Sequence, residues 1–401
     1  MEDKEKVVVE NKFGTLEVTV LICLTCFISI MSGMFLGHKA TQKVYEANQL
    51  SDELNEIISN YNYIIENYYG EIDKDEIIKG AIKGMVESLG DQYTSFIEDL
   101  DNENFNIQLQ GSFTGIGVEI ANSEQGIMVA RVFENSPAEK ADIQPGDIIL
   151  KIDEIDLHDK STTELINIIK GKYGEFELII KRNDEEITKV LQKDTVVIKS
   201  VFSKTFEENN KKIGYLKVTL FASNTDEQFK KELTKLENQK IDGLIIDVRW
   251  NSGGHLSTVK NMVSEFLDSS HVIYQTESKD GVEKTYSSGT VTKTYPIVVL
   301  ANEESASASE LLIGALRDEL GSKIVGTQTF GKGTVQELNT LSSTEQYKIT
   351  TKKWLTPKGQ SIDKVGIKPD FEIELTAEYY ETFEDSKDTQ LQKALSLFLE
   401  T

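Results

Sequence analysis

The sequence predicts an α/β protein of several domains, and three patterns along the chain support this prediction. Apolar residues recur at helical spacing between residues 44 and 100. From Phe113 onward, short β-like runs are separated by glycine and asparagine turns. From about residue 196, strands such as GLIIDV and PIVVLA alternate with helical segments, which is typical of an α/β core. A chain of 401 residues has room for two or three such domains.

Charge and cysteine usage exclude several classes of function. The formal net charge of −24 argues against binding to nucleic acid and against adsorption onto anionic lipid. Both cysteines, Cys23 and Cys26, lie in one apolar segment near the N-terminus. The rest of the chain therefore has no disulfide framework, no zinc site of the cysteine type and no thiol nucleophile. We expect neither a cofactor nor a metal.

The apolar segment runs from Val18 to Leu36 and contains no charged residue. At about 1.5 Å per residue, a helix of this length can just span the hydrocarbon layer of a membrane. A buried core helix and a cleaved signal peptide are alternatives. We expect an uncleaved single-pass anchor at 18–36 in the cell membrane, a short cytoplasmic tail at 1–17 and an extracytoplasmic remainder.

Two further helical segments show apolar faces. Residues 44–104 form a predicted helical region, with a second helix that begins near Asp73 and ends at Gly90. Residues 381–401 form a predicted C-terminal helix. Neither face has an evident partner, so we expect a homodimer. The residues of the two faces are Leu50, Leu54, Ile57, Ile58, Tyr61 and Ile65, and then Leu391, Ala394, Leu395 and Phe398.

Residues 105–193 form a distinct module. It opens with Gly115, Ile116, Gly117 and Val118, where glycines let successive backbone N–H groups point at one anion. The run SPAEKADIQPGDIILKID follows, with a serine cap, a proline at the first helical position and a PGD turn.

This order resembles a PDZ domain in the permuted form of bacterial proteases. The resemblance implies that Gly115, Ile116, Gly117 and Val118 hold the C-terminal carboxylate of a bound peptide. Asp142 stands where the family usually has glycine, and aspartate tolerates a left-handed backbone.

The stretch ESASASELL contains three serines, Ser305, Ser307 and Ser309, between a buried strand and a helix that begins near Ala308. The N-terminus of that helix offers free N–H groups that can stabilise an oxyanion. A plain N-cap is the alternative for any one serine. His255 is the histidine nearest to a candidate site, and no G-x-S-x-G motif occurs, so a lysine is the stronger candidate for a base.

Lys332 lies in GTQTFGKGTVQ, which partly matches a phosphate-binding loop. Gly333 stands where serine or threonine should bind magnesium, and a strand-like run follows where a helix is required. We therefore reject a nucleotide site.

Four segments together resemble the carboxy-terminal processing proteases, also called tail-specific proteases. They are ASASE, the lysine of TFGKGTVQ 25 residues after the middle serine, DVRWNSGG, and WLTPKGQSIDKVGIKPD. The resemblance implies a serine protease core at 196–380 with a Ser-Lys dyad. It assigns Ser307 as nucleophile, Lys332 as base and Gln336 as the third member, and the backbone N–H groups of Ala308 and Gly253 as oxyanion donors.

A lysine base must be neutral, and we expect Phe330, Val335 and the flanking glycines to desolvate it. The expected function is a serine endopeptidase that recognises the free C-termini of protein or peptide substrates through its PDZ domain. The alternative is a catalytically silent PDZ scaffold that only binds C-termini.

Overall fold

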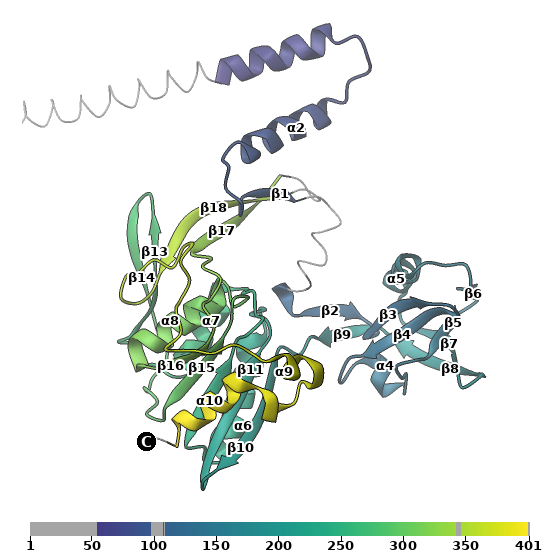
Figure 1. The fold of residues 1–401 in the computed structure, drawn as a ribbon. Helices are drawn as coiled ribbons and strands as arrows, with labels where there is room; N and C mark the ends of the chain where they lie inside the picture. The colour runs from purple at the N-terminus through teal and green to yellow at the C-terminus, as the bar shows by residue number, and fades with distance from the viewer. Residues whose placement is uncertain (1–53, 98–106, 108, 342–345, 400–401) are drawn as a thin grey trace, which may run out of the picture. The chain divides into compact units, whose positions relative to one another are not determined.

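The computed structural model describes residues 54–97, 107, 109–341 and 346–399 (Figure 1). The chain divides into two units, Met1–Ile82 and Lys83–Thr401. The predicted anchor at 18–36 lies outside the described residues. Within the described ranges, no helix has both the length and the apolar character needed to cross a membrane.

The described part of the N-terminal region contains two helices, followed by the short strand β1 at Ser95–Ile97. Residues 54–67 are helical, and α2 covers Lys74–Glu87. The Asp73 carboxylate accepts the backbone N–H of Asp75 at 3.0 Å, so α2 begins at the predicted cap. Several apolar side chains of the 54–67 helix are exposed, among them Leu54, Ile57 and Ile58.

The middle module is a β-rich domain with its own apolar core. Its main sheet has the order β3-β4-β5-β7-β8, with β6 paired to β5, and a separate ladder joins β2 to β9. Ser136 caps a short helix by accepting the N–H of Glu139, as predicted. Asp142 has a φ of 55°, as expected for a residue at a glycine-like position. The bounds are β2 Ser112–Gly115, β3 Val118–Ser123, β4 Gly126–Val132, α4 Pro137–Lys140, β5 Ile148–Ile152, β6 Ile155–Asp156, α5 Thr162–Gly171, β7 Glu175–Arg182, β8 Glu185–Gln192 and β9 Asp194–Val197.

The α/β core is built on a six-stranded sheet of order β10-β11-β12-β15-β16-β19. The β10–β11 pair is antiparallel, and every other pair in this sheet is parallel. The strands are β10 Val201–Glu208, β11 Lys211–Val218, β12 Gly243–Asp247, β15 Ile297–Ala301, β16 Lys323–Gly326 and β19 Phe371–Glu372.

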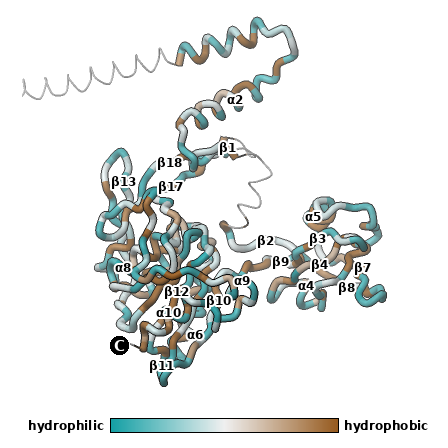
Figure 2. Tube along the Cα trace, viewed as in Figure 1, coloured by the Kyte–Doolittle hydropathy of each residue, from teal (hydrophilic) through white to brown (hydrophobic). Residues whose placement is uncertain are grey.

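Both faces of this sheet are covered, which explains why its central strands are continuously apolar. Alternate residues of β12 point to opposite faces: Leu244 packs with α6 (Thr225–Asn238), α7 (Leu256–Ser264) and α8 (Ala308–Leu320), and Ile245 packs with α10 (Thr389–Leu397). Figure 2 shows the hydrophobic colouring on β12.

The tail helix corrects one expectation. The four apolar residues of its predicted face lie in α10 and just after it, and all are buried against the sheet of the same chain. The tail helix therefore has a partner within the chain, and its apolar face is not free for dimerisation. Figure 1 shows α10 beside the sheet.

A buried ion cluster fastens the segment before α10 to the sheet. Arg249 donates from Nη2 to Asp247 and to Asp388, each over 2.7 Å. Burial alone would raise the pKa of Asp247, but Arg249 holds it below its ordinary value. Because Asp388 also accepts the N–H of Leu391, one carboxylate both caps α10 and ties it to the end of β12. Two short elements precede α10 in the sequence, α9 Ala377–Thr382 and the 3-10 helix Asp385–Lys387.

A second sheet is antiparallel, and its strands come from both sides of the lysine segment in the sequence. Its order is β1-β18-β13-β14, with β17 also paired to β18. The strand β17 begins two residues after Lys332, so the lysine lies where the chain enters this sheet. The bounds are β1 Ser95–Ile97, β13 Val272–Ser278, β14 Gly281–Tyr286, β17 Thr334–Thr340 and β18 Gln346–Leu355.

Candidate active site

Three neighbouring parallel strands of the core sheet end at the same edge. The loop after β12 contains residues 248–254, the loop after β15 contains 302–307, and the loop after β16 contains 327–332. Ligand sites of open α/β sheets form at the carboxyl ends of their strands. The fold therefore brings the NSGG, serine and lysine segments to one edge, although they are far apart in the sequence.

The three serines have different surroundings. Ser305 and Ser309 are fully buried, and their hydroxyls donate to the carbonyl oxygens of Val248 (2.8 Å) and Asn251 (2.7 Å). Both hydroxyls therefore join the serine loop to the loop after β12. Ser307 is the only one of the three that is partly exposed. Of the three, Ser307 alone is placed to meet a substrate.

The backbone of Ser307 is strained. Its φ is 54° and its ψ is −113°, a region that side-chain-bearing residues rarely adopt. Such a residue costs about 1–3 kcal/mol and occurs preferentially at functional sites. A sharp strand-to-helix turn of this kind lifts a nucleophile out of the fold in enzymes that carry G-x-S-x-G. Here the same kind of turn forms without that motif.

Gly253 lies directly against the serine turn. A Cβ on Gly253 would come within 3.0 Å of the Ser307 Cβ and within 3.2 Å of the Ala308 nitrogen. The φ of Gly253 is 112°, so any other residue would be both crowded and strained there. The Gly253 N–H donates to Asn251 Oδ1 at 2.9 Å. The Ala308 N–H, in contrast, has no acceptor among the described residues. Of the two predicted oxyanion donors, Ala308 is free and Gly253 is engaged within its own loop.

Glu310, which sequence reasoning missed, joins the serine segment to the lysine segment. It is fully buried on the first turn of α8. One of its oxygens, Oε2, accepts the backbone N–H of Ser307 and that of Lys332, each at 2.9 Å. The other accepts the Gly331 N–H at 2.7 Å and the Thr329 hydroxyl at 2.6 Å. Burial raises the pKa of Glu310, and these four donors oppose that rise.

The loop around Lys332 is tightly packed on one side. A Cβ on Gly331 would lie 2.8 Å from the Gly366 nitrogen, and one on Gly333 would lie 2.6 Å from the Asp363 nitrogen. The segment WLTPKGQSIDKVGIKPD therefore supports the lysine loop through its backbone. The Lys332 side chain lies with Nζ 5.0 Å from the centre of the Tyr93 ring.

Burial lowers the pKa of Lys332 below its ordinary value of 10.5. The charge of Lys348 lowers it further, while Glu310 acts in the opposite direction. The expected desolvation of Lys332 is therefore present. Phe330, one of its expected sources, is 56% exposed, and Tyr93, which the sequence did not suggest, contacts the lysine.

Gln336 lies on β17 opposite Thr350 of β18. The pairing slips by one residue just before Gln336, a bulge that redirects side chains. The Gln336 Nε2 donates to Thr334 Oγ1 at 2.8 Å and to Thr350 Oγ1 at 3.2 Å. Among the described residues, no hydrogen bond joins the Lys332 side chain to Ser307 or to Gln336.

Two alternatives from the sequence find no support in the geometry. His255 immediately precedes α7, and its Nε2 lies 3.0 Å from the carbonyl oxygen of Leu109. The chain after Lys332 enters the strand β17 instead of a helix, as the rejection of a nucleotide site predicted.

The predicted carboxylate loop of the middle module also has free donors. Gly117 has a φ of 82°, and among the described residues the N–H groups of Ile116 and Gly117 have no acceptor. The carbonyl oxygens of these two residues are used by Ala138 and Phe133. Among the described strands, β3, which begins at Val118, pairs only with β4, so no described strand covers its other edge.

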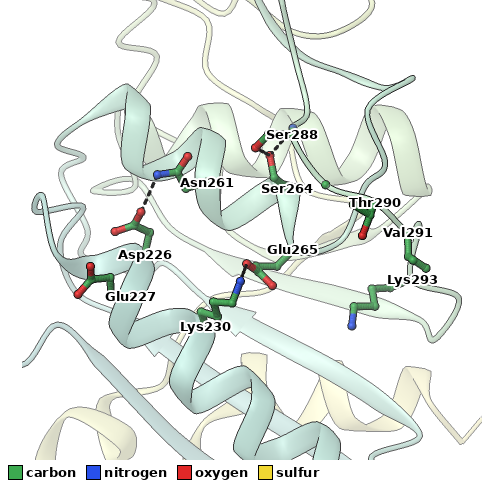
Figure 3. A pocket seen from close by; sticks show the side chains of 11 residues that line it. Asp226, Glu227, Lys230, Asn261, Ser264, Glu265, Ser288, Thr290, Val291 and Lys293 are labelled. Carbon is green, nitrogen blue, oxygen red and sulfur yellow. Dashed lines mark hydrogen bonds and ion pairs between the residues drawn. The ribbon is translucent and has the colours of Figure 1, made fainter.

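A cavity of about 550 Å³ lies elsewhere in the core, lined by α6, α7 and residues 288–293 (Figure 3). Its polar groups pair with one another: Lys230 bridges Glu265 at 2.8 Å, and Asn261 donates to Asp226 at 2.6 Å. None of its lining residues belongs to the serine, lysine or NSGG segments, so we assign it no part in the chemistry.

Comparison with known proteins decides the family. Residues 212–373 match the model of peptidase family S41, residues 114–191 match that of the PDZ domain, and residues 31–100 match that of the N-terminal domain of the activating protease CtpB. A probable CtpA-like serine protease of Staphylococcus epidermidis is 34% identical over 359 residues, which are 88% of this chain and 71% of that protein. The chain belongs to the carboxy-terminal processing proteases of peptidase family S41. The resemblance predicted from the sequence is confirmed.

Other relatives agree with this family of serine proteases. Carboxy-terminal processing protease CtpB of Bacillus subtilis is 34% identical over 307 residues, 76% of this chain but 64% of that relative. The chain thus matches slightly less than two thirds of the length of that relative. Among solved structures, a Bacteroides fragilis protein assigned to the S41 proteases has a TM-score of 0.50 at 16% identity, over 83% of this chain and 91% of that one. At that identity the likeness concerns the fold alone.

Proposed function

We propose that the chain is a serine endopeptidase in which Ser307 is the nucleophile and Lys332 is the general base. The observation that carries this proposal is the shared Glu310 oxygen, which accepts the backbone N–H groups of both residues at 2.9 Å. One buried carboxylate thereby holds the backbones of the nucleophile and the base close to each other. Pre-positioned groups of this kind supply a large part of enzymatic rate enhancement.

The proposed reaction is acyl transfer to water. The neutral Lys332 amine takes the proton of Ser307 Oγ while the oxygen attacks the peptide carbonyl carbon. The resulting ammonium returns that proton to the leaving amine as the peptide bond breaks, which leaves an acyl-enzyme. Lys332 then deprotonates a water molecule that attacks the ester carbonyl carbon. The ammonium returns this proton to Ser307 Oγ as the ester C–O bond breaks and the second product leaves.

The tetrahedral intermediates need donors for a negatively charged oxygen. The unoccupied N–H of Ala308, on the first turn of α8, supplies one donor together with the positive end of the helix. Gly253 is proposed as the second donor. Its N–H must turn away from Asn251 Oδ1 when substrate binds.

Substrate recognition is proposed to begin at the PDZ domain. The free N–H groups of Ile116 and Gly117, with Gly115 and Val118 beside them, suit the carboxylate at the C-terminus of a protein or peptide. The open edge of β3 suits the preceding residues of such a tail, because an extended peptide can add to it as a further strand.

Three remaining parts of the proposal rest on sequence patterns. Residues 18–36 are proposed as a membrane anchor, with the PDZ domain and protease core outside the cytoplasm. A homodimer is proposed through the exposed apolar side chains of the 54–67 helix, such as Ile57 and Ile58. No metal or cofactor is proposed for this chemistry.

The test is cleavage of matched unfolded peptides with free and amidated C-termini. The proposal predicts cleavage that is lost in Ser307→Ala and in Lys332→Ala and is retained in His255→Ala. Amidation removes the carboxylate charge and should slow cleavage about 5- to 150-fold, since a mismatched buried polar group costs about 1–3 kcal/mol. Cleavage that survives Lys332→Ala would contradict the lysine base, and equal rates on both peptides would contradict carboxylate recognition.

One observation favours a second candidate, a catalytically silent PDZ scaffold. In the described part of the chain, the Lys332 amine is hydrogen-bonded to neither member of its proposed triad and lies over the Tyr93 ring. A scaffold would bind peptide C-termini with an unreactive serine. A fluorophosphonate probe separates the two candidates, because it labels only an activated serine.

A further inference from the structure

We infer that Asp91 is a positioning residue for the proposed reaction, because through Thr350 it fixes which end of the Gln336 amide faces Lys332. The inference rests on the proposed function of Lys332 as base. It concerns a hydrogen-bond chain that begins outside the serine, lysine and NSGG segments.

This series of hydrogen bonds starts at a tight turn just before β1. The Asp91 carboxylate accepts the Tyr93 N–H at 3.1 Å and the Thr94 hydroxyl at 2.7 Å, so residues 91–94 hold one another. The Thr94 oxygen accepts the backbone N–H of Thr350 at 3.0 Å. Beyond the turn, β1 pairs in register with β18, with Ser95 opposite Lys348. The turn is therefore fastened to the strand that carries Thr350.

The Thr350 hydroxyl has only one proton, and it donates that proton in a hydrogen bond to Asp91. Thr350 Oγ1 donates to Asp91 Oδ2. Burial works against ionisation of Asp91, but the hydrogen bonds from Thr350, Thr94 and Tyr93 hold its pKa below the ordinary value. An ionised carboxylate can only accept hydrogen bonds, so Thr350 must act as the donor in this contact.

The hydrogen bond from Thr350 to Asp91 determines the orientation of the Gln336 amide. Because the hydroxyl proton is already used in that bond, the Thr350 oxygen can only accept a hydrogen bond from Gln336. The amide must then present its NH₂ group to Thr350, as the 3.2 Å contact from Nε2 records. Its carbonyl oxygen is left free for another donor. Thr334, the other partner of Gln336, has a hydroxyl that can either donate or accept, so it cannot make this choice.

The free carbonyl oxygen is the end of the amide that a lysine base needs. It can accept an N–H of the Lys332 amine and leave the nitrogen lone pair for Ser307. A reversed amide would instead donate to that lone pair and remove it from the reaction. The same turn carries Tyr93, whose ring lies 5.0 Å from Lys332 Nζ, so the turn lies beside both Gln336 and the base.

The two orientations also differ in their effect on the lysine. A carbonyl oxygen facing Lys332 favours the ammonium form, whereas an NH₂ group facing it favours the neutral amine. A variant that no longer holds the Gln336 amide in this orientation should therefore have both a lower pKa of Lys332 and a lower maximal rate of reaction at Ser307. The charged groups that act on Lys332 are Lys348 on β18 and Glu310 on α8, and neither changes in the variants below.

The experiment measures the rate of fluorophosphonate labelling of the full chain against pH for Thr350→Val and Thr350→Ser. Valine keeps the shape and suits a strand, but it cannot accept from Gln336. Serine keeps the hydroxyl. We expect Thr350→Val to label about 10- to 100-fold more slowly, a part of the roughly 10²–10⁴ that a general base provides, with its acid limb at lower pH. Thr350→Ser should retain the wild-type rate and pH profile.

The variant Asp91→Asn tests the first residue of this series of hydrogen bonds. The asparagine amide can donate to Thr350, which frees the threonine hydroxyl to donate to Gln336 and permits the reversed amide. The labelling rate of Asp91→Asn should fall as it does in Thr350→Val. Only the rates of these two variants are compared, because loss of the Asp91 charge shifts the pH profile by itself.

A wild-type rate in Thr350→Val or Asp91→Asn would overturn the inference. So would a slow rate in Thr350→Val with an unchanged pH profile, because that result indicates a purely structural role. A wild-type chain that takes no label dependent on Ser307 would overturn the proposed function, and this inference with it.

Discussion

Ser307 and Lys332 donate their backbone N–H groups to the same oxygen of the Glu310 carboxylate, each over 2.9 Å. The two residues are far apart in the sequence and come from the ends of different strands, β15 and β16. The Glu310 side chain thus joins their two loops, beside one backbone hydrogen bond from the Phe330 N–H to the Ser305 carbonyl oxygen at 3.1 Å, and its contribution can be tested directly.

Replacing Glu310 with glutamine should disrupt the lysine segment in either orientation of the amide. An NH₂ group would face either the N–H groups of Ser307 and Lys332, or the Gly331 N–H together with the Thr329 hydroxyl. We expect a loss of stability of about 1–3 kcal/mol and the loss of peptide cleavage, measured by urea unfolding and by a peptide assay. The control is Glu304→Gln on the exposed part of the same loop. Wild-type stability and activity in Glu310→Gln would contradict this role.

The rate of cleavage should depend on pH through Lys332. Burial depresses its pKa, so the neutral base accumulates as pH rises through a value below 10.5. The rate should increase over that window and reach a plateau before an ordinary lysine would titrate. The unfolded chain binds this proton more tightly than the folded chain, so the contribution of Lys332 to the free energy of unfolding also rises with pH across the same window. A rate that rises only above pH 10.5 would show that Lys332 is not desolvated.

The strain at Ser307 predicts an order of stability between two inactive variants. Alanine keeps a Cβ in the unfavourable region at φ 54°, whereas glycine adopts it freely. Ser307→Gly should therefore unfold at a higher temperature than Ser307→Ala, by a share of the roughly 1–3 kcal/mol that such strain costs. The matched pair Ser309→Gly and Ser309→Ala, inside α8, should show the reverse order, because glycine weakens a helix. The same order at both positions would remove the evidence for strain.

Gly333 should not tolerate alanine. An added Cβ would lie 2.6 Å from the Asp363 backbone nitrogen, so either the lysine loop or the 361–366 segment has to move. A misplacement of about 1 Å can cost about 10²-fold in rate, and we expect a loss of that order in peptide cleavage. Gly84→Ala, in open space on α2, is the control and should be fully active. Activity equal to the control would show that this loop does not position Lys332.

Local patterns predicted the elements around the site well. The apolar run PIVVLA and the small residues after it predicted a strand, a turn and a helix, and the structure has β15, the Ser307 turn and α8. The left-handed backbone of Asp142 and the cap at Ser136 were also predictable, because each depends on residues close in the sequence.

Contacts between distant segments were not predictable in the same way. Nothing near Glu310 in the sequence shows that its carboxylate reaches residues 329–332. Asp91 and Tyr93 reach the lysine region only because β1 pairs with β18. The apolar face of α10 was wrongly predicted to be free for the same reason, since its burial depends on how the finished sheet is covered.

The central claim is that Ser307 is activated by Lys332, and the site of fluorophosphonate attachment tests it most directly. The full chain is treated with the probe and digested, and the modified residue is located by mass spectrometry. The account predicts one adduct on Ser307, none on the buried Ser305 or Ser309, and none at all in Lys332→Ala. An adduct on another residue, or labelling of Ser307 at an unchanged rate in Lys332→Ala, would contradict it.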